Sequence, residues 1–126
     1  VHGQAGLDEL SPMGLTDVAE LHDGVVSQRT VSPEDFGLEP CSAEELAGGE
    51  PEDNARIILS VLEGEKQRGA RTAILMNAGA ALYVAGISDT LKEGTEAAAA
   101  AIDDGSALDA LKSLREATRG TSSTGL

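Results

Sequence analysis

The stretch VHGQAGLDEL, residues 1–10, decides the class of fold that this sequence predicts. It has no starting Met, and its first apolar residue runs directly into a loop bracketed by Gly3 and Gly6. The loop ends in two adjacent carboxylates, Asp8 and Glu9. We interpret the stretch as the end of a strand whose earlier residues are missing. Ligands of open α/β sheets bind beyond the carboxyl ends of strands, so the stretch predicts an α/β fold holding one piece of an enzyme site.

Asp8 and Glu9 are the strongest candidates for chemistry. Mg²⁺ prefers oxygen ligands, keeps several waters and is usually held by one or two carboxylates together with substrate phosphates. Successive side chains of a strand point to opposite faces, so the pair can share one hydrated ion only in a loop or in the first turn of a helix. The alternative is that both carboxylates only favour the positive end of a short helix.

Length and composition limit the architecture. A chain of 126 residues forms at most one domain. Phe36 and Tyr83 are the only aromatic residues, so Leu, Ile, Val and many Ala must fill the core. Such side chains suit helices that approach one another closely. No apolar run approaches the roughly 20 residues that span a bilayer.

The net charge of -13 is concentrated in the first half of the chain. Residues 1–63 hold fourteen acidic side chains against Arg29 and Arg56, whereas the remainder holds eight acidic and seven basic ones. An acidic surface repels phosphate backbones and anionic lipids, so nucleic acid and membranes are not the expected partners. The lone Cys41 cannot form an internal disulfide, which fits a reducing, cytoplasmic location.

The pattern of strand formers and turn residues predicts a hairpin over residues 16–31, with its turn at 22–24. Ser32 and Pro33 then begin a short helical piece. Further helices are predicted by caps, glycines and apolar spacing, and they cover residues 42–48, 51–63, 70–84, 88–104 and 106–118. The first of them should begin with a capping box formed by Ser42 and Glu45.

Three details of these helices are specific enough to check. The second of them should pack through an apolar stripe formed by Ala55, Ile58, Leu59 and Leu62. Residues 70–84 read as a buried helix in which Gly79 lets a neighbouring backbone approach closely. Ser88 or Asp89 should cap the helix that follows.

Other polar residues receive structural interpretations. His2 could be a proton donor, a metal ligand or a structural hydrogen-bonding group, and the last is favoured because no second His or Cys lies near it. Asp103 and Asp104 fit a solvated helix end better than a metal site. Asn77 lies within the buried helix, where its amide must find partners, and we expect it to tie helices together.

A set of short motifs and their order along the chain resemble those of the C-terminal part of the anthranilate phosphoribosyltransferase family. These motifs cover nearly the whole chain to about residue 114, and they lie at residues 1–3, 6–9, 18–21, 33–38, 46–49, 51–55, 77–83, 91–94 and 101–107. Each motif alone is weak, whereas the ordered set is specific.

The resemblance implies a phosphoribosyltransferase/nucleoside-phosphorylase-like α/β domain, with a strand end and hairpin followed by several helices. Residues 1–118 would be its C-terminal part, residues 119–126 a flexible tail, and the helical N-terminal domain and the phosphate-binding loops would be missing. The implied reaction joins anthranilate to phosphoribosyl pyrophosphate with Mg²⁺, in tryptophan biosynthesis. The implied assembly is a cytoplasmic homodimer.

The resemblance also implies that Asp8 and Glu9 coordinate Mg²⁺ near the ribosyl pyrophosphate. Family members often carry Asp where this chain has Ala5, and the segments that contact anthranilate and pyrophosphate lie upstream. The chain alone is therefore expected to be inactive. Two alternatives are a related phosphoribosyltransferase with another acceptor and a non-catalytic helical interaction module.

Overall fold

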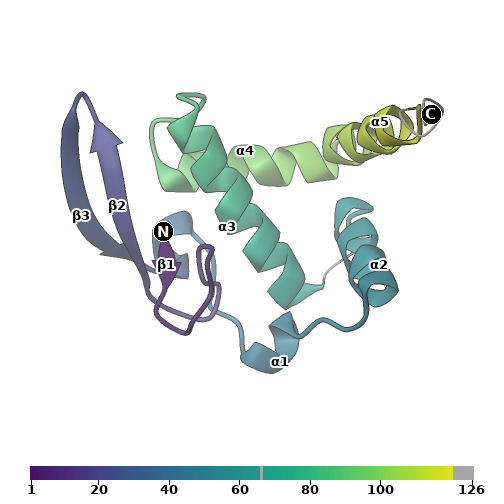
Figure 1. Cartoon of the computed structure of the whole chain (residues 1–126), viewed down its shortest axis with the longest axis horizontal. Helices are drawn as coiled ribbons and strands as arrows, with labels where there is room; N and C mark the ends of the chain where they lie inside the picture. Colours follow the sequence, from purple (N-terminus) through teal and green to yellow (C-terminus); the bar gives the residue numbers. More distant parts are fainter. Residues whose placement is uncertain (66, 121–126) are drawn as a thin grey trace, which may run out of the picture.

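The computed structural model describes residues 1–65 and 67–120, arranged as in Figure 1. Three strands form one antiparallel sheet in the order β1-β2-β3, and they are β1 His2–Gly3, β2 Thr16–His22 and β3 Val25–Val31. The 3-10 helix and the α-helices follow in sequence, and they are η1 Pro33–Phe36, α1 Ala43–Leu46, α2 Pro51–Leu62, α3 Arg68–Val84, α4 Leu91–Asp103 and α5 Ser106–Gly120.

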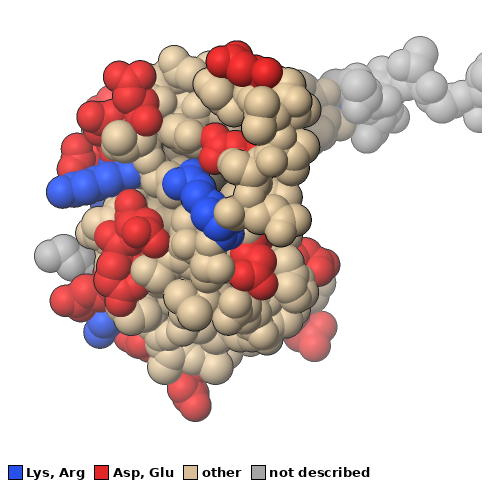
Figure 2. Space-filling model, turned by 90° about the vertical axis from the view of Figure 1, so that its left-hand side faces the viewer, with Lys and Arg blue, Asp and Glu red and all other residues tan. Residues whose placement is uncertain are grey.

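The hairpin formed by β2 and β3 confirms the predicted turn. Thr16 pairs with Val31 at one end and His22 with Val25 at the other. Asp23 and Gly24 between the strands have φ angles of 47° and 79°, and positive values at both positions are what a two-residue type I′ turn requires. The hairpin projects from the helices and is largely exposed (Figure 1). Figure 2 views this side of the molecule and shows acidic side chains with a few Lys and Arg among them.

Helix α3 lies between two apolar clusters and contributes to both. Met76 packs with Leu10, Val31 and Phe36. The adjacent Leu75 packs in a second cluster, whose other buried members are Val61, Ala98 and Ile102. The predicted helix over residues 70–84 is therefore confirmed, although its C-terminal end is solvent-facing rather than buried, since Val84 is 82% exposed.

Helices α3 and α4 cross where both lack a side chain. A Cβ atom on Gly79 would lie 2.6 Å from Oγ1 and 2.7 Å from the backbone N of Thr95. A Cβ atom on Gly94 would meet the carbonyl oxygen of Gly79. The close approach predicted for Gly79 is thus confirmed, and its partner is α4.

Two capping predictions have different outcomes. The Ser42–Glu45 capping box forms as predicted, because the Glu45 N–H donates to Ser42 Oγ at 3.3 Å and the Ser42 N–H donates to Glu45 Oε2 at 2.9 Å. The cap expected at Ser88 or Asp89 was wrong. Thr90 caps α4, since its Oγ1 accepts from the Glu93 N–H at 3.1 Å and its own N–H donates to the Glu93 carboxylate.

The packing face expected for α2 is confirmed only in part, because Leu62 packs against the second apolar cluster and Leu59 is half-buried. Val61 is fully buried, whereas Ile58 of the predicted stripe is 46% exposed and Ala55 is also exposed. At the other end of the chain, α5 continues through Gly120, two residues beyond the boundary expected at 118. The rest of the predicted tail, residues 121–126, lies outside the described residues. None of the helices in the described part has the length and apolar character needed to cross a bilayer.

Candidate metal centre

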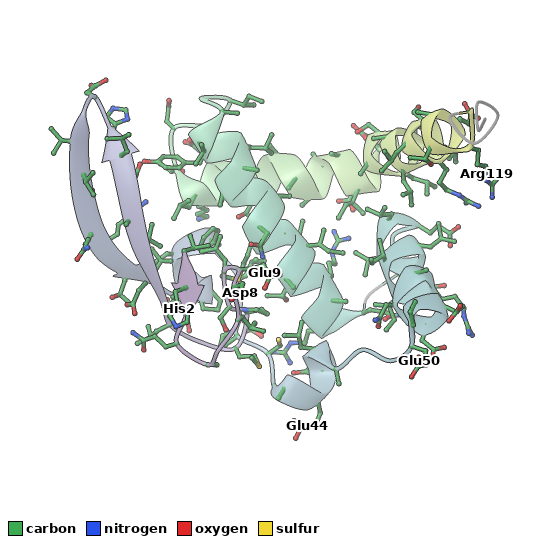
Figure 3. The ribbon with its side chains drawn as sticks, in the orientation of Figure 1. His2, Asp8, Glu9, Glu44, Glu50 and Arg119 are labelled. Carbon is green, nitrogen blue, oxygen red and sulfur yellow. The ribbon has the colours of Figure 1, made fainter. Side chains whose placement is uncertain are left out.

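Asp8 and Glu9 lie in the loop that follows β1, and both are exposed (Figure 3). The loop closes on itself because the Gly3 N–H donates to the Leu7 carbonyl at 2.9 Å and the Gly6 N–H donates to the Gly3 carbonyl at 2.8 Å. Gly6 has a φ of 95°, a value that residues with a Cβ rarely adopt. The two carboxylates therefore follow a tight, hydrogen-bonded turn, as the loop interpretation requires.

Helix α3 holds the other side of the carboxylate pair. The Leu10 N–H donates to Asn77 Oδ1 at 3.2 Å, and Asn77 Nδ2 donates to the Leu10 carbonyl at 3.3 Å. Leu10 is 4% exposed and belongs to the same buried apolar cluster as Met76. Asn77 does join separate elements, as expected from its place in a helix, but it joins α3 to the loop rather than to another helix.

Gly3 allows the two sides of this loop to come together. A Cβ atom at this position would lie 2.9 Å from Ser11 Cβ, 3.2 Å from Leu7 Cβ and 3.3 Å from the Glu9 carbonyl oxygen. The absence of a side chain at Gly3 is thus required by close packing. Its neighbour Gly6 is required by backbone conformation.

The two carboxylates have the chemistry that Mg²⁺ needs. Within the part of the chain that the structure describes, neither Asp8 nor Glu9 makes a side-chain hydrogen bond or an ion pair, so their oxygens are free to act as ligands. The same described residues contain no group of three or more His, Cys, Asp or Glu side chains suited to a metal. Two carboxylates are nevertheless a usual protein contribution to a Mg²⁺ site, because water and substrate phosphates complete the coordination. The donor set therefore fits the ion.

His2 and Cys41 do not join this centre. His2 is exposed, and in the described residues its side chain makes no hydrogen bond, so the structural bond expected for it is not found. Cys41 is buried, and burial raises the pKa of its thiol, with a further contribution from the charge of Glu45. A buried thiol with a raised pKa is a poor nucleophile, so Cys41 does not have the properties of a catalytic thiolate.

Asp103 and Asp104 serve the junction between α4 and α5. Asp103 forms an ion pair with Arg71 at 3.2 Å. Asp104 Oδ1 accepts from the Ser106 N–H at 2.8 Å, and hydrogen bonding from Ser106 lowers the pKa of the Asp104 carboxyl. These contacts support the interpretation of the pair as a helix-end feature.

A second polar group, which the sequence analysis missed, joins the hairpin to α3. The Tyr83 hydroxyl donates to Glu20 Oε1 at 2.7 Å, and Arg29 donates to Glu20 Oε2 at 3.1 Å. The three residues line a cavity of about 670 Å³ between β2 and α3, which Leu10 also lines. The available signal was the alternation in β2, where Thr16 and Glu20 fall on the same inward-facing side of the strand.

The chain matches the model of the glycosyl transferase family, a/b domain, over residues 1–108. It is 47% identical over 118 residues to the anthranilate phosphoribosyltransferase of Methanobrevibacter smithii, which covers 94% of this chain and 35% of that protein. The enzyme of the same name from Myxococcus xanthus is 49% identical over 117 residues, covering 92% of this chain and 34% of that protein. The chain thus spans about a third of the length of the curated relatives it matches.

Solved structures give the same result. The anthranilate phosphoribosyltransferase from Saccharomyces cerevisiae in complex with PRPP and Mg superimposes with a TM-score of 0.78 at 32% identity, covering 88% of this chain and 32% of that one. The same enzyme in complex with 4-fluoroanthranilate gives a TM-score of 0.79 at 31% identity, with the same coverage. The α/β class and the resemblance expected from the ordered motifs are both confirmed.

Proposed function

This chain belongs to the glycosyl transferase family by its a/b domain, and we propose that it is the C-terminal part of an anthranilate phosphoribosyltransferase. The observation that carries the proposal is the 47% identity to a curated enzyme of that name across 94% of this chain. The complexes of a structural relative with PRPP and Mg and with 4-fluoroanthranilate support both substrates and the metal. The alternative of a non-catalytic helical module is not favoured by these relatives.

In the proposed reaction, the bond between ribose C1 and the pyrophosphate oxygen of phosphoribosyl pyrophosphate breaks. A bond forms between C1 and the amino nitrogen of anthranilate, which gives up one proton. Positive charge develops on the ribose and negative charge on the pyrophosphate in the transition state. When bound, Mg²⁺ supplies positive charge beside the leaving pyrophosphate.

Asp8 and Glu9 are proposed to hold and orient this ion through direct or water-mediated contacts. Their support is the geometry of the loop: both are exposed, and both are free of side-chain partners in the described part of the chain. Neither carboxylate is assigned the role of a general base. The proton lost by the anthranilate nitrogen is proposed to be accepted by a group other than Asp8 or Glu9.

The proposal assigns only part of the catalytic site to this chain. Because the chain spans about a third of its curated relatives, the complete activity is expected to need the segments that contact pyrophosphate and anthranilate. The complete enzyme is proposed to act in the cytoplasm as a homodimer, as the family resemblance implies.

The test is Mg²⁺-dependent formation of phosphoribosyl anthranilate by the complete enzyme that carries this chain. We expect Asp8→Ala and Glu9→Ala each to lower the rate at limiting Mg²⁺ by about 100-fold or more, since removing one group that stabilises transition-state charge has effects of this size. Part of the loss should be recovered at high Mg²⁺. Product formation at a series of Mg²⁺ concentrations measures both effects.

Glu50→Ala is the matched control. Glu50 is exposed, and within the described residues its carboxylate has no hydrogen bond or ion pair, so it resembles the pair chemically but follows α1 instead of β1 (Figure 3). This variant should retain the parent activity. If the parent is active and the Asp8 and Glu9 variants match it, the metal assignment is wrong. If the parent does not use anthranilate, another acceptor replaces it in the proposal.

A further inference from the structure

Asn77 uses its entire amide group to hold neighbouring backbone. Its Oδ1 accepts from the Leu10 N–H at 3.2 Å, and its Nδ2 donates to the Leu10 carbonyl at 3.3 Å and to the Ala73 carbonyl at 2.9 Å. A primary amide has two N–H donors, so both are engaged. The bond to Ala73 holds the Asn77 side chain in place on its own helix. The two bonds to Leu10 then hold the loop against this side chain.

The bond to the Leu10 N–H acts directly on Glu9. This N–H belongs to the peptide unit that joins the two residues, and a peptide unit is planar. Holding the N–H in place therefore fixes the orientation of the plane that also contains the Glu9 carbonyl. The backbone rotation that directs the Glu9 side chain relative to α3 is restricted as a result.

The carboxylate pair lies between this anchor and a second one. On its N-terminal side, the Leu7 carbonyl accepts from the Gly3 N–H at 2.9 Å. On its C-terminal side, Leu10 is bonded to Asn77 and lies in the buried apolar cluster that contains Met76, the residue before Asn77. Only Asp8 and Glu9 separate the two anchors.

We propose that Asn77 is a positioning residue for Asp8 and Glu9, which sets the direction of the two carboxylates toward a divalent cation. This inference rests on the proposed function, because it takes the pair to be the metal ligands. Asn77 does not touch the ion in this account and acts only through the Leu10 backbone. Groups that orient metal ligands from outside the coordination sphere typically change metal affinity by about 10- to 100-fold when they are removed.

Asn54 provides a matched control within the same chain. Its Oδ1 accepts from the Gly49 N–H at 2.8 Å, and its Nδ2 donates to the Gly49 carbonyl at 3.0 Å. This is the same two-way contact between a helical asparagine and a loop residue. It joins α2 to the loop before it, away from the carboxylate pair.

The experiment compares Asn77→Ala and Asn54→Ala in the complete enzyme. Binding of Mn²⁺ alone is measured by loss of the free-ion electron paramagnetic resonance signal, and the Mg²⁺ dependence of transfer is measured separately. We expect Asn77→Ala to weaken Mn²⁺ binding by about 10- to 100-fold and to shift the Mg²⁺ dependence to higher concentration. Asn54→Ala should change neither quantity, although it also removes a two-way contact between a helical asparagine and a loop residue.

A folded Asn77→Ala enzyme with unchanged Mn²⁺ binding would overturn the inference. An equal loss in both variants would also overturn it, because the effect would then be a general loss of stability. A parent enzyme that binds Mn²⁺ in an Asn77-dependent way but does not transfer to anthranilate supports the positioning role and overturns the proposed function. Mn²⁺ binding therefore tests the positioning role of Asn77, whereas transfer to anthranilate tests the proposed function.

Hydrogen exchange in the unmodified enzyme tests the inference even if Asn77→Ala does not fold. If the Asn77 bond favours metal binding, metal binding must favour the Asn77 bond to the same extent. Addition of Mg²⁺ and phosphoribosyl pyrophosphate should therefore slow exchange of the Leu10 amide more than exchange of the Gly49 amide. Equal changes at the two amides would contradict a positioning role.

Discussion

A methyl group added at Gly3 would lie 2.9 Å from Ser11 Cβ and 3.2 Å from Leu7 Cβ, so the loop would have to move to accept it. Gly14 has open space around the same position and is the matched control. We expect Gly3→Ala to lower the free energy of unfolding by about 1–3 kcal/mol, the usual cost of inserting a group into a packed site. Gly14→Ala should leave it nearly unchanged or raise it by about 0.4–1 kcal/mol.

Denaturant unfolding of the complete enzyme measures both glycine variants. The Gly3 variant should also need more Mg²⁺ for activity, because the displaced neighbours include the Glu9 carbonyl oxygen. Equal free energies of unfolding for the two variants would contradict this prediction, because the neighbours of Gly3 would then move to accept a methyl group without loss of stability.

At the scale of single residues, the local sequence predicted the kind of environment that a residue occupies but not the residues that it contacts. The adjacent acids after two glycines correctly predicted a loop at Asp8 and Glu9. A helical asparagine correctly predicted a need for hydrogen-bond partners at Asn77. Its partner, Leu10, could not be predicted because 67 positions separate the two residues, and no local pattern records a contact of that range.

Among the elements, the hairpin is held to α3 by a hydrogen bond that depends on the protonation of Tyr83. The hydroxyl donates to Glu20 at 2.7 Å, and this bond raises the pKa of Tyr83 above the ordinary value of about 10. A group whose pKa is raised by folding contributes stability that is fully present below its unfolded pKa. That stability is lost as the pH rises through the folded pKa, because the phenolate no longer donates and faces the Glu20 carboxylate.

The corresponding prediction concerns alkaline conditions. Thermal unfolding of this chain should show a drop in midpoint as the pH passes above about 10. The Tyr83→Phe variant, which cannot ionise, should begin with a lower midpoint and show a smaller drop over the same range. Parallel curves for the two proteins would contradict a role for the Tyr83–Glu20 bond in holding the hairpin.

The helix boundaries show where local signals are sufficient. The Ser42–Glu45 box forms as predicted, since both partners lie within one turn. Near α4, three successive residues can act as caps, and Glu93 selects Thr90 because it lies at the spacing that completes a capping box. The face that α2 buries was predictable only in part from its own apolar residues. Leu62 packs inward as expected, whereas the contact with α3 and α4 buries Val61 and leaves Ile58 exposed.

Across the whole molecule, the dominant electrostatic feature is a net charge of -13 in 126 residues. Like charges on one compact surface repel one another and destabilise the folded state. Raising the salt concentration from about 0.1 M to about 1 M shortens the screening length from about 10 Å to about 3 Å. We therefore expect the midpoint of thermal unfolding of this chain to rise over this range, as circular dichroism can measure.

Sodium chloride and potassium chloride should act alike in this experiment, because the effect is screening and not binding at one site. A midpoint that stays constant or falls with salt would mean that the ion pairs of the described residues, such as Arg71 with Asp103, outweigh the general repulsion.

At this scale, composition alone could not have identified the family. The order of the short motifs along the chain did so, because it covers most of this chain rather than one local element. The acceptor could not be predicted in the same way, since nothing in these residues was recognised as a contact to it.

The loop between β1 and β2, which Asn77 of α3 holds at Leu10, also has a thermodynamic consequence. Ordering the backbone of one free residue costs about 1–2 kcal/mol in conformational entropy. Because Leu7 and Leu10 are already bonded in the folded chain, the backbone of Asp8 and Glu9 between them is restricted by folding. If Asp8 and Glu9 are the metal ligands, as proposed, the ion would meet carboxylates on a backbone that is already ordered, so little of its binding energy would be consumed in ordering the chain. The entropy cost of ordering this loop would therefore fall on folding and not on ion binding.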